Sequence, residues 1–335
     1  MPFDAIILDE AHRIGNFTKT RRAIKQISQG SKHRYALSAT PMMNSRAPEL
    51  YGIIDWCFPG ALGAYRPYLD KFTIRNAWGG VLRTVNVDDL RQYIRRYMYY
   101  KPLSELEVQL PPITIEDIPF DLSQKERDLY TKITQEILFD IEQQLINKVE
   151  NPVMIQNTLV KMIRLLECCD SMELLGSDTT STKLEVLKDR LEDVAINGNK
   201  VIIFSRFTRM IEILKRELAD YCPAVITGQI TGQHRAEAVR AFGNDPKHRV
   251  LLCSEAGGEG LNLEMANVIF HYDLPYSYGK YVQRNGRIAR LTQTKPMMVY
   301  NLVARQSMDE HIAKIIARKQ DLSEQLLMSD LRRLL

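Results

Sequence analysis

The sequence lacks the features of a membrane-spanning, exported or disulfide-stabilised protein. No apolar run reaches the roughly 18 residues needed to cross a bilayer, and the first residues lack a basic segment followed by an apolar one. The 335 residues include five cysteines, an odd number, and no C-x-x-C pair. We therefore expect reduced thiols, no structural zinc, no membrane partner and a cytoplasmic location in a bacterium or, for a phage-encoded chain, in its host. The same features are compatible with a nuclear location.

Charge and length leave the class of protein open. Lys and Arg number 45 against 41 for Asp and Glu, so the formal net charge is only +4. That balance is compatible with nucleic-acid binding but does not indicate it. The length suits about two domains of ordinary size, and 45% hydrophobic residues can supply their cores.

Strands alternate with helices near both ends of the chain, which is the pattern of a parallel α/β sheet. Near the start, residues 5–8 and 35–37 predict strands on either side of a basic helical stretch, 18–29. In the second half, the predicted strands are 200–204, 224–227, 250–253, 268–271 and 297–302, and the predicted helices are 208–220, 233–242, 279–290 and 309–327. In the middle, residues 123–148 and 152–169 predict long amphipathic helices, and residues 107–119 an extended connector.

An acidic pair, Asp9 and Glu10 of the motif D-E-A-H, follows the first predicted strand. A carboxylate at a strand end can hold magnesium through water, and a neighbouring acid can position the water that attacks a γ-phosphate. Acidic residues at this place also often cap the next helix. The four letters alone therefore leave a catalytic and a structural role open.

A second polar motif, Ser38, Ala39, Thr40 and Pro41, follows the next predicted strand. Small hydroxyl residues there can sense a phosphate and relay its presence to another domain. They can equally cap a helix that has Pro41 in its first turn. Ligands of open α/β sheets bind at the carboxyl ends of the strands, so both motifs lie where a site is expected.

Two further motifs lie in the second half of the chain. The glycines of E-A-G-G-E-G-L-N-L, residues 255–263, can bring backbone N–H groups against a phosphate or a DNA backbone, although a plain strand-to-helix turn has the same composition. In Q-R-N-G-R-I-A-R, residues 283–290, a helix would place Arg287 and Arg290 on one face. Two guanidinium groups suit a triphosphate, and a solvated basic helix face is the alternative.

In this order and at these distances the four motifs resemble motifs II, III, V and VI of superfamily-two helicases. Three further stretches are similar to the Swi/Snf branch, so that the resemblance covers nearly the whole chain. They are L-S-A-T-P-M-M-N-S at 37–45 with F-P-G at 58–60; L-P-P at 110–112 with Q-K-E-R-D-L-Y at 124–130; and K-V-I-I-F-S at 200–205 with Thr227.

The resemblance implies a role for each matching residue. Asp9 would hold magnesium through water, Glu10 would position the attacking water, and Arg287 and Arg290 would act as arginine fingers. His12, Gly258, Glu259 and Gln283 would face the ATP; Ser38, Ala39 and Thr40 would couple the lobes; and Ser205, Arg206, Thr227, Gly257, Gly260 and Asn262 would contact double-stranded DNA. Members of this family translocate along duplex DNA, usually without strand separation, through sequence-blind phosphate contacts.

The phosphate-binding loop G-x-x-x-x-G-K-[ST], which the family carries ahead of the D-E-A-H motif, is absent. Gly279 and Lys280 are followed by Tyr281, which cannot replace the Ser or Thr of that loop. Three explanations stay open: a split motor whose partner supplies the loop, a piece of a longer protein, or a retired motor that binds DNA or protein without turnover. The intact acidic pair and arginines favour the first two.

We therefore predict an α/β fold with two RecA-like lobes, the first incomplete, and an α-helical insertion between them. The expected divisions are the end of lobe one at 1–106, an extended linker at 107–122, the insertion at 123–182, lobe two at 183–308 and a C-terminal helix at 309–335. The predicted function is that of a component of an ATP-dependent DNA translocase, inactive without a phosphate-loop segment and working with a further protein or nucleoprotein complex. The alternative is a non-catalytic DNA-binding or scaffold protein.

Overall fold

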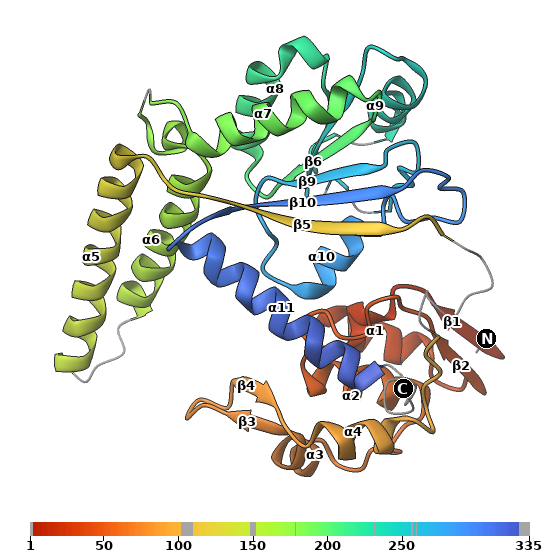
Figure 1. Cartoon of the computed structure of the whole chain (residues 1–335). Coiled ribbons are helices and arrows are strands. Elements are labelled where there is room, and N and C mark those ends of the chain that lie inside the picture. Colours follow the sequence, from red (N-terminus) through yellow and green to blue (C-terminus); the bar gives the residue numbers. More distant parts are fainter. Residues whose placement is uncertain are drawn as a thin grey trace, which may run out of the picture. The chain divides into compact units, whose positions relative to one another are not determined.

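The computed structural model describes residues 3–101, 110–147, 152–177, 179–230, 232–255, 257–258 and 260–327. It forms two units (Figure 1). Unit 1 contains residues 1–109, 276–283 and 315–335, and unit 2 contains residues 110–275 and 284–314. The segments 276–283 and 315–335 belong to unit 1 although they follow most of unit 2 in the sequence, an arrangement that the sequence divisions did not anticipate.

Unit 1 begins with a two-stranded parallel sheet, β1 (Ala5–Leu8) and β2 (His33–Ala36), joined by α1 (Lys19–Ile27). Side chains alternate between the faces of a strand. Ile6 and Leu8 pack against the buried Ile14 and Trp56, whereas Ile7 is 67% exposed on the other face. The predicted strand–helix–strand order is confirmed, and one face of the sheet carries an exposed apolar side chain.

The rest of unit 1 is mostly helical and is built from α2 (Ala47–Cys57), α3 (Tyr65–Phe72) and α4 (Val87–Ile94). Their core includes Leu50, Tyr68, Phe72, Leu90 and, from α11 (Met308–Leu327), Leu326. An antiparallel hairpin, β3 (Thr73–Arg75) and β4 (Val81–Thr84), lies between α3 and α4. The sequence analysis missed this hairpin because each strand is too short for a periodic pattern to develop.

Unit 2 contains a six-stranded parallel sheet in the order β5-β10-β9-β6-β8-β7. The strands are β5 (Ile113–Phe120), β6 (Val201–Ser205), β7 (Ala224–Ile226), β8 (Val250–Ser254), β9 (Val268–His271) and β10 (Met297–Ala304). Residues 113–120 of the segment expected as a linker are extended, but they form an edge strand that pairs with all of β10, and residues 107–109 of that segment lie outside the described residues. The sequence could not show this, because the pairing joins residues about 180 positions apart and leaves no local pattern.

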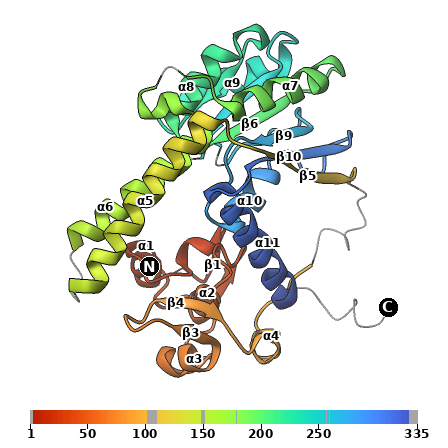
Figure 2. The same cartoon turned by 60° about the vertical axis from the view of Figure 1, so that its left-hand side comes forward.

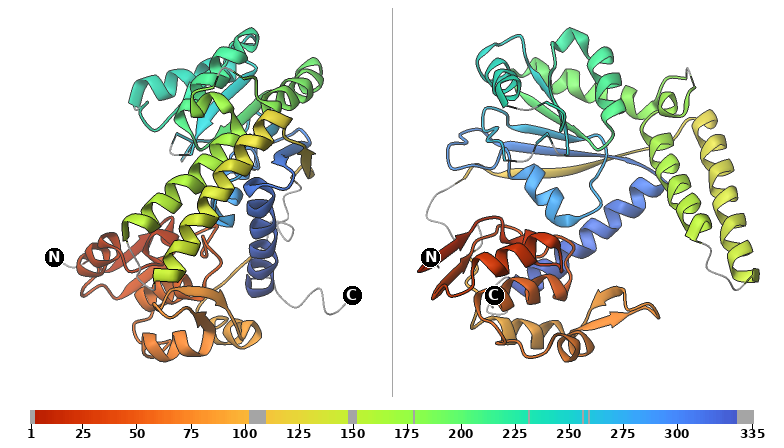
Figure 3. Two further views of the ribbon diagram at one scale, coloured as in Figure 1. Left: turned by 90° about the vertical axis from the view of Figure 1, so that its left-hand side faces the viewer. Right: turned by 180° about the vertical axis from the view of Figure 1, so that it is seen from behind.

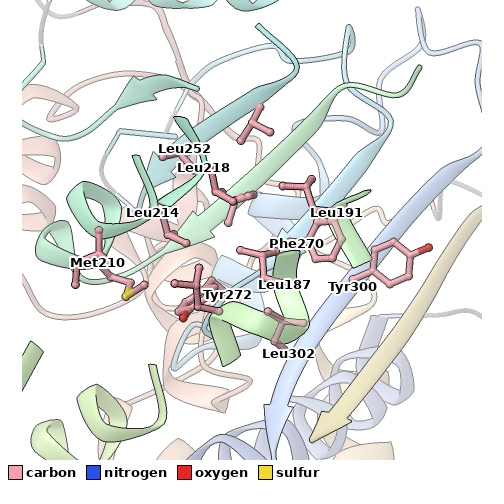
Figure 4. Packing of buried hydrophobic residues seen from close by; sticks show 14 of the residues in the cluster. Leu187, Leu191, Met210, Leu214, Leu218, Leu252, Phe270, Tyr272, Tyr300 and Leu302 are labelled. Atoms are coloured by element: carbon pink, nitrogen blue, oxygen red, sulfur yellow. The ribbon is translucent and has the colours of Figure 1, made fainter. Parts of the chain in front are cut away.

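Helices cover both faces of this sheet, which makes its strands continuously apolar. On one face, Ile203 and Phe270 pack with α7 (Thr182–Ile196) and α8 (Thr208–Glu217), as Figure 4 shows for part of the cluster. On the other, Ile202 and Phe204 pack with Phe242 of α9 (Gly232–Asn244). The helix α10, most of which belongs to unit 1, spans only Tyr278–Asn285 and is shorter than the predicted 279–290.

The predicted helical insertion is a pair of neighbouring helices, α5 (Gln124–Asn147) and α6 (Pro152–Asp170) (Figure 2). Ser123 and Glu126 cap α5 reciprocally: the Ser123 N–H donates to Glu126 Oε2 over 2.8 Å, and the Glu126 N–H donates to Ser123 Oγ over 3.4 Å. Among the described residues, no helix is both long and apolar enough to cross a bilayer.

Candidate functional site

The acidic pair of unit 1 lies at the carboxyl end of β1, and both side chains are exposed. Glu10 has a left-handed backbone, with φ of 52° and ψ of 45°, which turns the chain sharply after the strand. Its N–H donates to Asp9 Oδ1 over 2.8 Å. Its carboxylate Oε2 lies 3.2 Å from Nδ1 of His12, so that three residues of the D-E-A-H motif hold one another at the strand end.

Backbone hydrogen bonds bring the second motif beside the first. The Leu37 N–H donates to the Leu8 carbonyl over 2.8 Å, and the Ala11 N–H donates to the Leu37 carbonyl over 2.9 Å. These bonds extend the pairing of β1 and β2 past the strand ends. Ser38 therefore begins directly beside the acidic pair, as the position of both motifs at strand ends predicts.

A residue from the fourth motif completes this group within unit 1. Gln283 Nε2 donates to Thr40 Oγ1 over 3.2 Å, and the Thr40 N–H donates to Ser38 Oγ over 3.2 Å. The Gly279 N–H donates to the Met43 carbonyl over 3.0 Å. A Cβ on Gly279 would lie 2.7 Å from the Met43 Cα, so only glycine allows α10 to approach the loop that follows Thr40.

In unit 2, one carboxylate that the sequence analysis did not assign organises the ends of two strands. Asp273 follows β9 and is 2% exposed. Its Oδ2 accepts from Ser205 Oγ over 2.6 Å, and its two oxygens accept from the Arg206 N–H over 3.0 and 2.9 Å. A polar residue directly after a predicted strand was the available signal, since the other motifs occupy equivalent positions.

Asp273 is part of a buried polar cluster that reaches α10. Arg284 Nη1 donates to the Asp273 carbonyl over 2.9 Å and lies 3.3 Å from His271 Nδ1. His271 Nε2 lies 2.8 Å from Asn285 Oδ1. Burial, reinforced by the Arg284 guanidinium, lowers the pKa of His271 to about 3. The imidazole is therefore neutral, with its proton on Nε2 toward the amide oxygen and with Nδ1 accepting from Arg284.

The glycines of the third motif have mainly a packing role. A Cβ on Gly257 would lie 2.2 Å from the Ile226 carbonyl oxygen, and one on Gly258 would lie 2.9 Å from Phe204. Both are buried. Their N–H groups donate to Oγ and to the carbonyl of Ser254 over 3.2 and 3.0 Å. The N–H groups of Gly257 and Gly258, expected at DNA and at ATP respectively, thus donate within the loop itself.

The two arginines predicted as neighbours on one helix face are not on a helix. The helix α10 ends at Asn285, because Gly286 is a poor helix residue and Arg287 turns toward the third motif. The Arg287 carbonyl accepts from the Leu263 N–H over 3.1 Å, and its Nη1 donates to the Leu261 carbonyl over 3.2 Å. Arg287 is 8% exposed, whereas Arg290 is exposed, so only Arg290 is open to a ligand.

The residues expected to contact DNA also divide into buried and exposed ones. Ser205 is completely buried and Thr227 is 5% exposed, so neither can touch a DNA backbone directly; Ser205 instead holds Asp273. The Arg206 side chain is 8% exposed and lies 3.4 Å from Asp273. Gly260 and Asn262 are exposed. Glu259 lies outside the described residues.

Magnesium fits the donors of unit 1 only together with a nucleotide. Among the described residues, no three His, Cys, Asp or Glu side chains gather as a metal cluster. Mg²⁺ usually takes one or two carboxylates, several waters and substrate phosphates. The exposed Asp9 and Glu10 supply such a carboxylate set.

Parallel α/β units with these motifs are the arrangement of the RecA-like lobes of helicase-like ATPases. The family model described as the SNF2-related domain matches residues 2–174, and that of the helicase conserved C-terminal domain matches residues 182–292. The chain belongs to the SNF2-related family.

Known proteins support this assignment. The chain is 27% identical over 331 residues to the human SWI/SNF-related matrix-associated actin-dependent regulator of chromatin subfamily A member 1, covering 92% of this chain and 30% of the relative. It is 28% identical to the putative ATP-dependent helicase/translocase YwqA of Bacillus subtilis, covering 98% of this chain and 36% of that protein. It thus spans about a third of these relatives' lengths. The Sulfolobus solfataricus SWI2/SNF2 ATPase core, solved in complex with dsDNA, is 25% identical, with a TM-score of 0.53 over 96% of this chain and 68% of the other.

Proposed function

We propose that this chain is a component of an ATP-dependent double-stranded-DNA translocase of the Swi/Snf type, completed by a phosphate-loop segment. The observation that carries the proposal is the group formed by Glu10, His12, Thr40 and Gln283 in unit 1. It joins residues of the first, second and fourth motifs of the sequence within unit 1. A scaffold protein without turnover has no need to keep these polar contacts.

The uncovered face of β1 and β2 supports the need for a further segment. Ile7, Tyr35 and Leu37 are 67%, 54% and 54% exposed. Among the described strands, neither β1 nor β2 has a partner on its outer edge. Parallel sheets are almost always covered on both faces and contain more than two strands. An α/β segment, preceding this chain or on a separate one, would extend the sheet and cover these side chains, and would carry the phosphate loop.

The residues of unit 1 then take distinct parts in ATP hydrolysis. Magnesium bound with ATP would be held through water by Asp9, and it would neutralise charge on the phosphates. Glu10, held by His12 and its own backbone turn, orients the attacking water and accepts its proton. Thr40 and Gln283 share a hydrogen bond, and the two side chains change position together when the γ-phosphate leaves. Arg290 is the exposed arginine that stabilises charge in the transition state.

Unit 2 is the proposed DNA-binding unit. Gly260 and Asn262 are exposed at the loop after β8, and Arg287 ties this loop to the end of α10. The contact would be to phosphates, which explains binding that is independent of sequence. Ser205 and Asp273 hold the neighbouring loop in shape rather than touching DNA.

The test is steady-state ATPase activity of the chain alone and of the chain co-expressed with an α/β segment that carries the phosphate loop, each with and without duplex DNA. The chain alone should not turn over ATP usefully, because the loop supplies the lysine and amide cradle for the phosphates. In the pair, Arg290→Ala should lower turnover by ~10³-fold or more, as for arginine fingers. The matched control is Arg240→Ala, which removes an exposed charge from α9 and should leave turnover unchanged.

The outcomes separate the two candidate functions. Turnover by the chain alone that Glu10→Gln abolishes contradicts the need for a second segment. DNA binding without turnover in the pair supports the non-catalytic alternative instead. Equal losses of ATP turnover in Arg290→Ala and Arg240→Ala would contradict the arginine-finger role of Arg290.

A further inference from the structure

The β3–β4 hairpin of unit 1 carries three exposed apolar side chains. Trp78, at the turn, is 73% exposed, Leu82 is 64% exposed and Ile74 is 38% exposed. The hairpin extends from the end of unit 1 that contains α3 and α4 (Figures 1 and 3). Trp is usually largely buried because its ring is a large apolar surface. A Trp exposed to this extent, on a hairpin with two further exposed apolar side chains, therefore indicates a contact with another molecule.

The turn that carries Trp78 is held in one conformation by Asn76. Its Oδ1 accepts from the Trp78 N–H over 3.2 Å and from the Gly80 N–H over 2.7 Å. The Asn76 N–H donates to the Gly80 carbonyl over 2.9 Å, and Gly79 takes the left-handed backbone, with φ of +80°, that the turn requires. A Trp on such a fixed turn loses little conformational freedom when it binds a ligand.

The base of the hairpin is fastened to the motif region of unit 1. Thr73 and Thr84 lie opposite each other and are buried. Thr84 Oγ1 accepts from the Ala47 N–H over 3.0 Å and lies 3.4 Å from the Ser45 carbonyl. Ser45 belongs to the loop that follows Thr40. A ligand at the hairpin tip is thereby connected to the second motif through two strands and one threonine.

The hairpin and its flanking residues carry positive charge, which favours an anionic partner. Residues 71–87 contain Lys71, Arg75 and Arg83 and no Asp or Glu. Arg83 is exposed. Arg75 forms an ion pair with the exposed Asp70, and Lys71 lies 3.6 Å from Asp89. These are weak surface pairs, which a phosphate can replace.

We propose that Trp78 is a stacking platform for an unpaired nucleobase, with Arg83 and Arg75 beside it for the adjoining phosphates. Basic surfaces with exposed aromatic rings bind single strands in this way, since every base has a face that stacks. The site takes bases that a closed duplex does not offer, at a strand end or in a single-stranded stretch. It rests on the proposed function only in that the chain acts on DNA, and it adds a ligand that duplex translocation does not require.

Intrinsic fluorescence provides a direct test, because the chain has two tryptophans and Trp56 is completely buried. The probes are a single-stranded oligonucleotide, a blunt linear duplex and a closed-circular duplex at equal nucleotide concentration. We expect the single strand to quench Trp78 and the closed circle to leave its emission unchanged. Quenching by the blunt duplex as well assigns the site to strand ends; quenching by the single strand alone assigns it to single-stranded stretches.

Three variants make the test independent of a general loss of folding. Trp78→Ala should weaken single-strand binding, followed by anisotropy of a labelled oligonucleotide, by ~5- to 150-fold, and Trp78→Phe should restore most of it. The matched control Leu82→Ala removes an exposed apolar side chain of the same hairpin and should have little effect. Binding of the closed-circular duplex should be unchanged in all three variants. If neither the parent chain nor any variant binds this duplex, that result contradicts the proposed function and leaves the stacking site to be judged by the single strand.

Two results would overturn the proposal. Equal weakening by Trp78→Ala and Leu82→Ala would indicate an apolar protein-docking surface instead of a stacking site. Unquenched Trp78 emission with a bound single strand would show that the base contacts lie elsewhere.

Discussion

The neutral, buried His271 makes the stability of unit 2 depend on pH in a predictable way. Its pKa falls from an ordinary 6.5 to about 3 in the folded chain. Below pH 6.5 the unfolded chain therefore binds a proton that the folded chain does not. The free energy of unfolding should decrease as the pH falls from about 6.5 toward 3, and the contribution of His271 should be fully present at higher pH.

The magnitude follows from the two pKa values. One pKa unit corresponds to about 1.4 kcal/mol, and pH 5 lies 1.5 units below the ordinary value and above the folded one. Lowering the pH from 7 to 5 should thus cost unit 2 about 2 kcal/mol through His271 alone. Other groups titrate in this range too, so the comparison needs a variant that lacks the imidazole.

His271→Gln keeps an amide donor for Asn285 and does not titrate. Both tryptophans, Trp56 and Trp78, lie in unit 1, so fluorescence does not report the unfolding of unit 2. Hydrogen exchange of β6 and β9 amides at pH 5, 6 and 7 does. The free energy of opening should fall by about 2 kcal/mol more in the parent chain than in the variant. Parallel pH dependence in the two proteins would refute the assignment of a neutral, buried imidazole.

Two further changes test the packing of unit 2. Lys183 Nζ is fully buried between Asp170 and Asp309, at 2.7 and 2.6 Å. Lys183→Met should cost ~3–5 kcal/mol in a urea unfolding experiment, and a loss below about 1 kcal/mol would contradict a stabilising ion pair at this buried lysine. Gly257→Ala places a Cβ against the Ile226 carbonyl oxygen and should cost at least ~1–3 kcal/mol. Gly243→Ala, whose nearest contact is a methyl at 3.5 Å, is its control, and equal stability of the two variants would show that the loop can move away.

Local sequence patterns placed the first two motifs correctly after their strands. The run Ala5–Leu8 is a strand as predicted, and the acidic pair follows it at the sheet edge, because an apolar run that ends in charges can bury itself only up to those charges. The same reasoning placed β9 at Val268–His271. The capping box of Ser123 and Glu126 began α5 where the sequence indicated, since capping depends on residues three positions apart.

Tertiary contacts decided the features that local patterns could not. Whether Ser205 faces DNA or a buried carboxylate depends on Asp273, 68 residues away. The end of α10 depends on the hydrogen bonds that Arg287 makes with Leu261 and Leu263. The helical period of the sequence alone had predicted a helix that continues to Arg290. The third motif's glycines were expected to face a phosphate, but they fill the narrow space beside β7 and Phe204.

The sequence by itself thus determined the family, the α/β class and the motif residues, because these follow from residue types and short-range spacing. The tertiary structure decided which motif side chains are exposed, joined β5 to the sheet and revealed Trp78 on its hairpin. The physical reason is that burial and strand pairing are set by residues far apart in the chain. A motif read along the sequence gives the chemistry available, and packing decides which of those groups a ligand can reach.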